Sequence, residues 1–340
     1  MAVTTSRKTG GTLANGVLLI FANMGILPVL LIGAFIFFGT LEPRFLSSFN
    51  MFNVARQATY LTVAAMGQMV LLITSGFDLS MGSTTALTSV VAALVMTYFL
   101  GIDPNAVPLA IAAGIGAGLL VGVAVGAVNG IGVAVLNVPA FMMTLGMLSA
   151  VFGVALIMSG GAPIFGVPEE FKMWFGYGRL FDIPAPMYYT AMLFVVLYFV
   201  LNYTRMGRYL YAIGSNRRAA ELSGISTRTH LFFAYVICGV MAACAGLLLM
   251  ARAGTGEPTL GQKLVLEPIA ACVIGGVSLF GGVGRLPNVI LGAFFMSLLT
   301  NGMNLIRIES YAQQIVIGFV LVLAIVVDQL RLRYVASMGR

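Results

Sequence analysis

The residue types that most often perform chemistry in proteins are few and scattered in this chain of 340 residues. Its three cysteines, Cys238, Cys244 and Cys272, lie in apolar stretches without CxxC or any other metal-ligand spacing, so we expect small packing side chains and no disulfide. The single histidine, His230, cannot form a metal site by itself. The sequence therefore predicts no metal centre.

No segment has the residues needed to bind or hydrolyse a nucleotide. The segment GEPTLGQK, Gly256–Lys263, is the nearest to a phosphate-binding P-loop, but its lysine is one position late and no Ser or Thr follows it. No nucleophile is paired with a base, and no acidic or histidine relay lies in the centre of an apolar run. We expect a protein that is not an enzyme, so either another protein supplies its energy or it is passive.

One carboxylate, Asp78, interrupts apolar sequence in SGFDLSMGS. A carboxylate close to a membrane is costly and often functional. Here Gly76 and Gly82 break the helical pattern around it, and this favours a simpler role. We expect Asp78 to cap the following helix through the amide groups of Ser80 or Met81.

The elements that position these residues follow from composition. The chain is 60% hydrophobic and 9% charged, whereas soluble domains carry about 25% charged residues. The charges form widely spaced clusters with long uncharged runs between them. This pattern predicts an all-α polytopic membrane protein surrounded by lipid and excludes a soluble enzyme. The net charge of +7 does not by itself indicate a nucleic-acid partner, and we expect none.

A helix needs about 20 apolar residues to cross the hydrocarbon core. The uncharged run between Asp103 and Glu169 is too long for one helix, and Asn137 and Pro139 divide it in two. Ten spans result: Val17–Gly39, Gln57–Phe77, Leu79–Ile102, Leu109–Gly130, Ala140–Gly160, Ile183–Thr204, Thr229–Ala251, Pro268–Gly284, Leu286–Ile306 and Ser310–Val327. The expected organisation is a tail over 1–16, a single transmembrane domain over 17–330 and a tail over 331–340.

The basic residues predict the orientation. Membrane proteins concentrate Lys and Arg in their cytoplasmic loops. With both termini in the cytoplasm, ten spans place 11 of the 18 basic residues on the cytoplasmic side. An even number of spans agrees with this bias, and we expect the first span to be retained rather than cleaved as a signal peptide.

Glycines recur at every fourth position of the fourth span, at Gly114, Gly118, Gly122, Gly126 and Gly130. Such a stripe stays on one face of a helix and lets another helix approach closely. We favour structural packing over a sliding surface.

The longest basic loop is Thr204–His230. A turn around Met206–Ala212 is followed by a short helix, Arg217–Leu222, which Ser215 or Asn216 can cap and Gly224 can end. Two short amphipathic segments of this kind can dock on a partner protein. The positive charge of the loop agrees equally well with a loop that rests on anionic lipid.

Four motifs occur in order along the chain: GFDLSMGS, NVPAFMMTLGML, TRMGRYLYAIGSNRRAAELSGI and IAACVIGGVSLFGGVG. The series resembles the permease subunits of bacterial ABC sugar importers of the ribose, xylose and galactose type, from about Phe45 to Leu330. The resemblance implies a multi-span inner-membrane subunit that dimerises with a copy of itself or a similar permease. It also implies a cytoplasmic ATPase that binds ATP and Mg²⁺, and a periplasmic sugar-binding protein that delivers the substrate. This chain itself would bind no cofactor.

The resemblance also implies a role for the basic loop, because permeases of this family meet their ATPase there. The matching residues are Gly207, Arg208, Asn216, Ala219, Ala220, Glu221 and Gly224. Residues that line the pathway are expected near span ends and interiors, with Asn137, Phe141, Thr144, Asn301 and Asn304 as candidates. For each of these five, helix–helix hydrogen bonding or core packing is the competing interpretation.

The chain departs from the family pattern at two positions. Val265 stands where the family often has an acidic residue, and Pro268 replaces a helix former, although proline is tolerated at a helix start. Two alternatives to a monosaccharide or polyol importer stay open. One is an ABC permease for branched-chain amino acids, nucleosides or an autoinducer-type sugar, and the other is a passive or ion-coupled secondary carrier.

Overall fold

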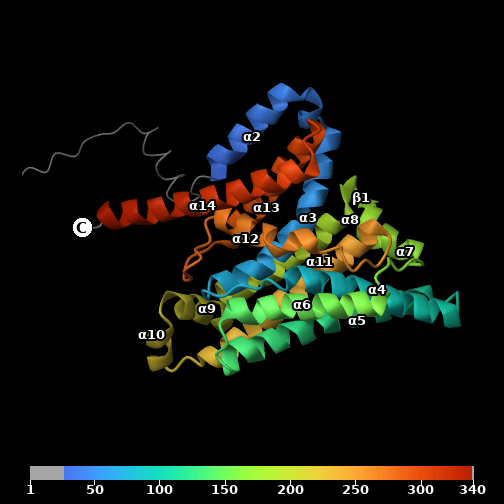
Figure 1. Ribbon diagram of the computed structural model, residues 1–340, viewed down its shortest axis with the longest axis horizontal. Coiled ribbons are helices and arrows are strands. Elements are labelled where there is room, and N and C mark those ends of the chain that lie inside the picture. Colours follow the sequence, from blue (N-terminus) through green and yellow to red (C-terminus); the bar gives the residue numbers. More distant parts are fainter. Residues whose placement is uncertain (1–26, 339–340) are drawn as a thin grey trace, which may run out of the picture.

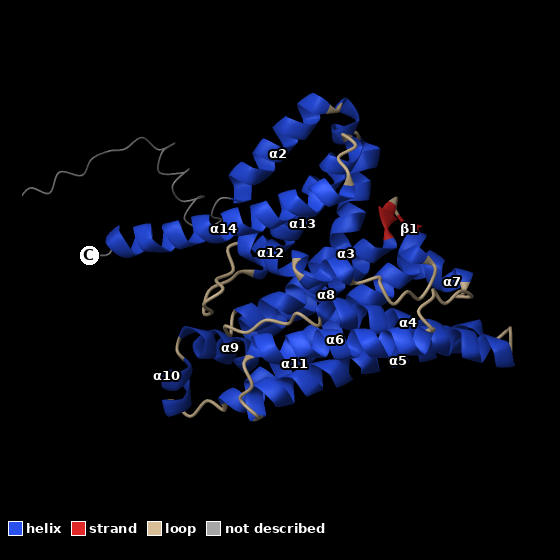
Figure 2. Ribbon diagram, in the orientation of Figure 1, coloured by secondary structure: helices blue, strands red, loops and turns tan. Residues whose placement is uncertain are grey.

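The computed structural model describes residues 27–338, and within them it is almost entirely helical (Figures 1 and 2). The α-helices are α2 (Leu27–Leu41), α3 (Ser48–Leu72), α4 (Met81–Ile102), α5 (Val107–Gly130), α6 (Ala140–Ser159), α7 (Glu169–Lys172), α8 (Ala185–Tyr203), α9 (Arg205–Ser215), α10 (Arg217–Leu222), α11 (Thr227–Ala253), α12 (Glu267–Ile274), α13 (Leu286–Leu305) and α14 (Ser310–Met338). A small hairpin pairs β1 (Arg179–Leu180) with β2 (Ile183–Pro184). The predicted tail over 1–16 and the start of the first predicted span lie outside the described residues.

Six helices of the described part are long and apolar enough to cross a membrane: α4, α5 with its π-helical extension to Val135, α6, α8, α11 and α13. Shorter apolar helices are Leu27–Leu41 and the segment Ser310–Leu323 of α14. The all-α membrane class is confirmed, but the count of ten continuous spans is not. Helix α14 also runs through residue 330 to Met338 without a break, where we expected the C-terminal tail to begin.

The clearest difference concerns the predicted span Pro268–Gly284. Helix α12 has only eight residues and ends at Ile274, so it is about 12 Å long and cannot cross the membrane alone. Residues 275–285 form a loop in which Gly276, Gly281 and Gly282 have positive φ. Glycine adopts this conformation without a steric penalty. The chain therefore turns at these glycines, although its apolar sequence predicts one continuous helix.

Helix α3 occupies the centre of the bundle. Seventeen of its residues are buried, and it packs against α8, α11, α12 and α13. It contains Asn50, Gln57 and Gln68 among its apolar residues, which is why it is less hydrophobic than the helices around it. Helices α4, α5 and α6 lie beside one another along one side of the molecule (Figure 1).

The two ends of the molecule differ. Helices α9 and α10 lie at one end, together with the C-terminal end of α14, whereas α7 and the β1–β2 hairpin lie at the other end (Figure 1). The basic loop and the C-terminal end of α14 therefore lie at the same end of the bundle.

Candidate functional site

The predicted docking loop forms two short helices, α9 and α10, which follow α8 and precede α11. Thr204 caps α9 by accepting a hydrogen bond from Gly207 N, and Asn216 caps α10 by accepting one from Ala219 N at 3.0 Å. Gly224, with φ of 79°, follows the end of α10. The sequence prediction for Arg217–Leu222 matches α10, with Asn216 as the cap.

The seven predicted docking residues divide into two groups. Five of them are exposed, namely Arg208, Asn216, Ala219, Glu221 and Gly224, whereas Gly207 and Ala220 are buried. Gly207 lies so close to the Leu201 carbonyl that a Cβ would collide with it. Leu222, which the sequence analysis did not single out, is 77% exposed beside them. The composition of this polar loop does not indicate that its leucine is exposed.

Glu221 is held in one position by its neighbours. Its carboxylate accepts a hydrogen bond from Thr227 Oγ1 at 3.0 Å and forms ion pairs with Arg217 and Arg218. The Thr227 hydroxyl, followed by the two arginines, lowers the pKa of this carboxyl below its usual value. Glu221 therefore remains ionised and joins α10 to the start of α11.

Helix α9 rests on two loops that are far apart in the sequence. Tyr211 donates a hydrogen bond to Gly284 O at 2.8 Å, and Gly214 lies against both the Ile73 carbonyl and the Gly282 amide. These loops, residues 73–80 and 275–285, are joined to each other as well. Gly282 N donates to Ile73 O at 2.9 Å, and Ser75 Oγ donates to Phe280 O at 2.7 Å.

Asp78 lies in the first of these loops and is 1% exposed. Its Oδ1 accepts hydrogen bonds from Ser80 N at 2.7 Å and Ser80 Oγ at 2.6 Å. Asn129 Nδ2 reaches Ser80 Oγ at 2.9 Å and Asp78 Oδ2 at 3.4 Å. The structure confirms the predicted hydrogen bond from the Ser80 amide to Asp78, although Ser80 itself is the N-cap residue of α4. It also adds a connection to α5 that the sequence did not indicate.

The glycine stripe of α5 packs against α4 and α11. All five glycines are buried. A Cβ at Gly114 would meet Met96 of α4, whereas Cβ atoms at Gly122, Gly126 and Gly130 would meet the backbone of α11 at Gly239, Tyr235 and Phe232. The backbones of α5 and α11 therefore approach closely along this face.

The structure does not bring the five predicted pathway residues together. Asn137, with φ of 55°, lies exposed just before α6, and Phe141 lies exposed in the first turn of α6. Thr144 donates to Ala140 O within α6. The two asparagines of α13 lie elsewhere and make helix–helix hydrogen bonds. Asn301 pairs with Asn50 of α3, and Asn304 accepts from Gln313 of α14 at 2.7 Å.

Asn137 lines a cavity of about 410 Å³ that lies beside α9 and the start of α10. Ser75 and Asn216 also line this cavity. Both Ser75 and Asn137 have a left-handed backbone conformation, which is uncommon for residues other than glycine. The cavity therefore joins a predicted pathway residue to the predicted docking surface.

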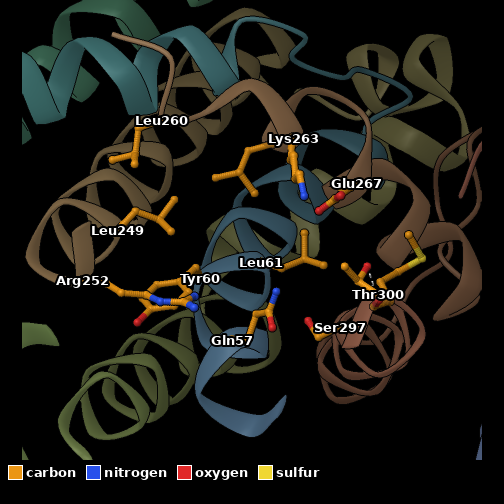
Figure 3. A pocket seen from close by; sticks show the side chains of 12 residues that line it. Gln57, Tyr60, Leu61, Leu249, Arg252, Leu260, Lys263, Glu267, Ser297 and Thr300 are labelled. Carbon is orange, nitrogen blue, oxygen red and sulfur yellow. Dashed lines mark hydrogen bonds between the residues drawn. The ribbon is translucent and has the colours of Figure 1, made fainter. Parts of the chain in front are cut away.

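A second cavity, of about 200 Å³, lies between α3, the end of α11, the start of α12 and α13 (Figure 3). Its lining includes the polar residues Gln57, Tyr60, Arg252, Glu267 and Ser297. The Arg252 guanidinium lies 5.5 Å from the centre of the Tyr60 ring. Sequence reasoning missed this site because its residues come from distant segments.

The two residues that depart from the family pattern lie in different parts of the structure. Pro268 lies in the first turn of α12, where a proline is tolerated. Val265 contacts the glycine at the start of α4, since a Cβ on Gly82 would collide with both Val265 and the Gly261 carbonyl. Residues 254–266 therefore pack closely on α4.

Comparison with known proteins identifies the family. The model of the family described as "Branched-chain amino acid transport system / permease component" matches residues 50–325. The ribose import permease protein RbsC of Escherichia coli K12 is 38% identical over 85% of this chain and 88% of its own length. The D-allose transport system permease protein AlsC of the same strain is 34% identical over 86% and 87%. The galactose/methyl galactoside import permease protein MglC of Haemophilus influenzae is 33% identical over 85% and 89%. No solved structure matches the chain.

The helical bundle, the helix pair α9–α10 and this similarity over most of the chain lead to one assignment. The chain belongs to the family of permease components of ABC import systems, and it is a multi-pass membrane protein.

Proposed function

We propose that the chain is the translocation subunit of an ATP-driven, binding-protein-dependent importer of a monosaccharide or related polyol. The observation that carries this proposal is the identity of 33–38% to ribose, allose and galactose permeases over about 85% of the chain. The chain itself supplies the pathway and has no catalytic role. ATP and Mg²⁺ are bound by a separate cytoplasmic ATPase.

The α9–α10 pair is the proposed docking site for that ATPase. It combines exposed basic residues with an exposed leucine, Leu222, on one surface. Its attachment to residues 73–80 and 275–285 supports the proposal, because movement of α9 reaches α3, α4 and α13 through them. Alternating access then arises when ATP binding favours one arrangement of these helices over the other.

The other partners follow from the same assignment. A second permease subunit, identical or similar, completes the pathway, and the apolar exposed face of α6 with Met142 and Leu145 is a surface it can cover. A periplasmic sugar-binding protein delivers substrate at the end that carries α7 and the β1–β2 hairpin. Both termini then lie in the cytoplasm, and the bias of basic residues toward that side supports this orientation.

Reconstitution tests the proposal. Proteoliposomes that contain the permease, its ATPase and its binding protein should accumulate D-ribose, D-allose or D-galactose when ATP is supplied. Omission of the ATPase should abolish accumulation. Uptake that persists without the ATPase would instead identify a passive or ion-coupled carrier.

The description of the family model favours one second candidate, an importer of branched-chain amino acids. Radiolabelled leucine in the same proteoliposomes separates the two. Accumulation of leucine, without accumulation of any of the three sugars, would replace the sugar assignment.

A further inference from the structure

A groove of about 560 Å³ lies where α8 begins. Residues between 173 and 180 line one side of it, and side chains at the start of α8 line the other. Hydrogen bonds join the two sides, since Tyr188 Oη donates to Leu180 O and Ala185 N donates to Gly178 O, both at 2.8 Å. The protein therefore sets the shape of this groove, which we call the α8 groove, before any ligand binds.

Aromatic side chains gather around the α8 groove. Trp174, the only tryptophan of the chain, lines it and is 69% exposed. Tyr188 and Tyr189 line it as well. Tryptophan and tyrosine are enriched where membrane-spanning helices reach the lipid headgroups. Helix α8 is long and apolar enough to span a membrane, and the groove lies at its first turn, so this composition is that of a membrane–water interface.

One positive charge in the α8 groove has no protein partner. Arg179 lines the groove and is exposed. Within residues 27–338, its guanidinium forms neither a hydrogen bond nor an ion pair with a protein group. Lys172, a few residues earlier, is by contrast paired with Glu169. A guanidinium binds a phosphate through two parallel hydrogen bonds, so Arg179 offers an anionic headgroup a partner that no side chain of this protein occupies.

The α8 groove continues into an exposed apolar face of α8. The exposed side chains Tyr188, Met192, Val195 and Phe199 recur at every third or fourth residue, so they lie on one face of the helix. From Tyr188 to Val195 the helix rises about 10 Å, which is within the roughly 15 Å that one leaflet contributes to the hydrocarbon core. A headgroup at Arg179 therefore leaves an apolar surface along which an acyl chain can lie.

We propose that the α8 groove binds an anionic phospholipid, with its phosphate on Arg179, its glycerol region beside Trp174 and an acyl chain along α8. A soluble partner protein can meet Trp174 and Arg179, but it cannot follow α8 into the bilayer. The continuity of the groove with the apolar face of a membrane-spanning helix therefore favours a lipid. The site goes beyond the proposed function, because its ligand is a component of the membrane and not the transported molecule.

The fluorescence of Trp174 tests the site, because the chain contains no other tryptophan. Full-length permease is reconstituted into phosphatidylcholine vesicles that contain an equal, small mole fraction of either brominated phosphatidylglycerol or brominated phosphatidylcholine. Bromine on an acyl chain quenches a tryptophan that it contacts. Both leaflets carry the brominated lipid, so the direction of insertion does not matter. Phosphatidylglycerol should be enriched at the groove about fivefold, the effect expected for one arginine at a membrane surface, and should quench Trp174 more strongly.

Two arginine variants separate a specific site from general attraction of anionic lipid. R179Q should abolish the preference, so that the two brominated lipids quench equally. R307Q removes the same charge from another exposed arginine, which lies just before α14 and does not line the groove, and it should retain the preference. The Tm of both variants should match the wild-type value, because both side chains are exposed.

Three results would overturn the proposal. Equal quenching of the wild type by the two lipids would show an ordinary lipid-facing surface, and a preference that persists in R179Q would show that the phosphate does not bind there. Absence of quenching by either lipid would show that Trp174 faces water or another protein, such as a second permease subunit. Each of these results leaves the importer assignment intact, because the experiment does not measure uptake.

Discussion

The hydroxyl of Tyr211 donates a hydrogen bond of 2.8 Å to the carbonyl oxygen of Gly284, and this bond joins helix α9 to the loop that precedes α13. One turn further along α9, Gly214 lies against the carbonyl of Ile73 in the other loop. A single short helix thus holds two connections of the transmembrane bundle at once. Force applied to α9 from outside the membrane has a direct route to α3, α4 and α13.

Removing the Tyr211 hydroxyl should weaken coupling. Y211F deletes one hydrogen bond, worth about 1 kcal/mol, while the ring still packs against the hydrophobic core. We expect ATP hydrolysis to continue and sugar uptake per ATP to fall about two- to fivefold. The control is Y209F on the same helix, whose ring packs on His230. Uptake and hydrolysis measured in the same proteoliposomes check the prediction, and an unchanged ratio in Y211F would contradict it.

Leu222 should contribute to ATPase binding. Burial of an exposed leucine contributes about 1.5–3 kcal/mol, so L222S should weaken the affinity of the permease for its ATPase about tenfold or more. Phe181, 88% exposed in the turn between β1 and β2, provides the control variant F181S. Titration of the ATPase onto detergent-solubilised permease measures both. Equal affinities for L222S and F181S would exclude α10 from the interface.

Substitution of a glycine of α5 should lower the stability of the protein when the new side chain collides with a neighbouring helix. In G122V the new side chain meets the carbonyl of Gly239 on α11, and overpacking of this kind costs about 3 kcal/mol. In G116V, on the same helix, nothing lies within 4 Å of the new Cβ. The Tm of purified protein should therefore fall in G122V and stay close to the wild-type value in G116V. Similar losses in both would mean that helix propensity, not packing, sets the effect.

Local signals in the sequence predicted local structure well. Helix α10 begins after Asn216 and ends before Gly224 because a capping side chain and a glycine suffice to define six residues. The predicted span Pro268–Gly284 failed for a different reason. Its composition is apolar throughout, and the turn depends on the contact of Gly282 with Ile73, more than 200 residues earlier.

The candidate sites show the same contrast between residues that are close in the sequence and residues that are brought together only by the fold. The predicted docking residues lie in one continuous segment, so one motif contained them all. The cavity beside α3 takes Gln57, Arg252 and Ser297 from three separate helices. Similarly, Asn301 pairs with Asn50 of α3, which no local pattern in the sequence indicates. Convergence of this kind depends on tertiary packing and leaves no pattern in the sequence.

Asp78 allows a decisive comparison between a structural and a functional carboxylate. D78A removes the acceptor for Ser80 N and Ser80 Oγ, and buried donors left without partners cost about 1–3 kcal/mol each. Asn129 Nδ2 loses only its longer bond, because it also donates to Ser80 Oγ. D78N keeps a side-chain oxygen for Ser80. If the residue acts only as a cap, the Tm should fall in D78A and remain near the wild-type value in D78N, with uptake preserved in D78N. A stable D78N protein that fails to transport would instead show that the negative charge itself takes part in transport, because the two side chains have nearly the same shape and differ in ionisation.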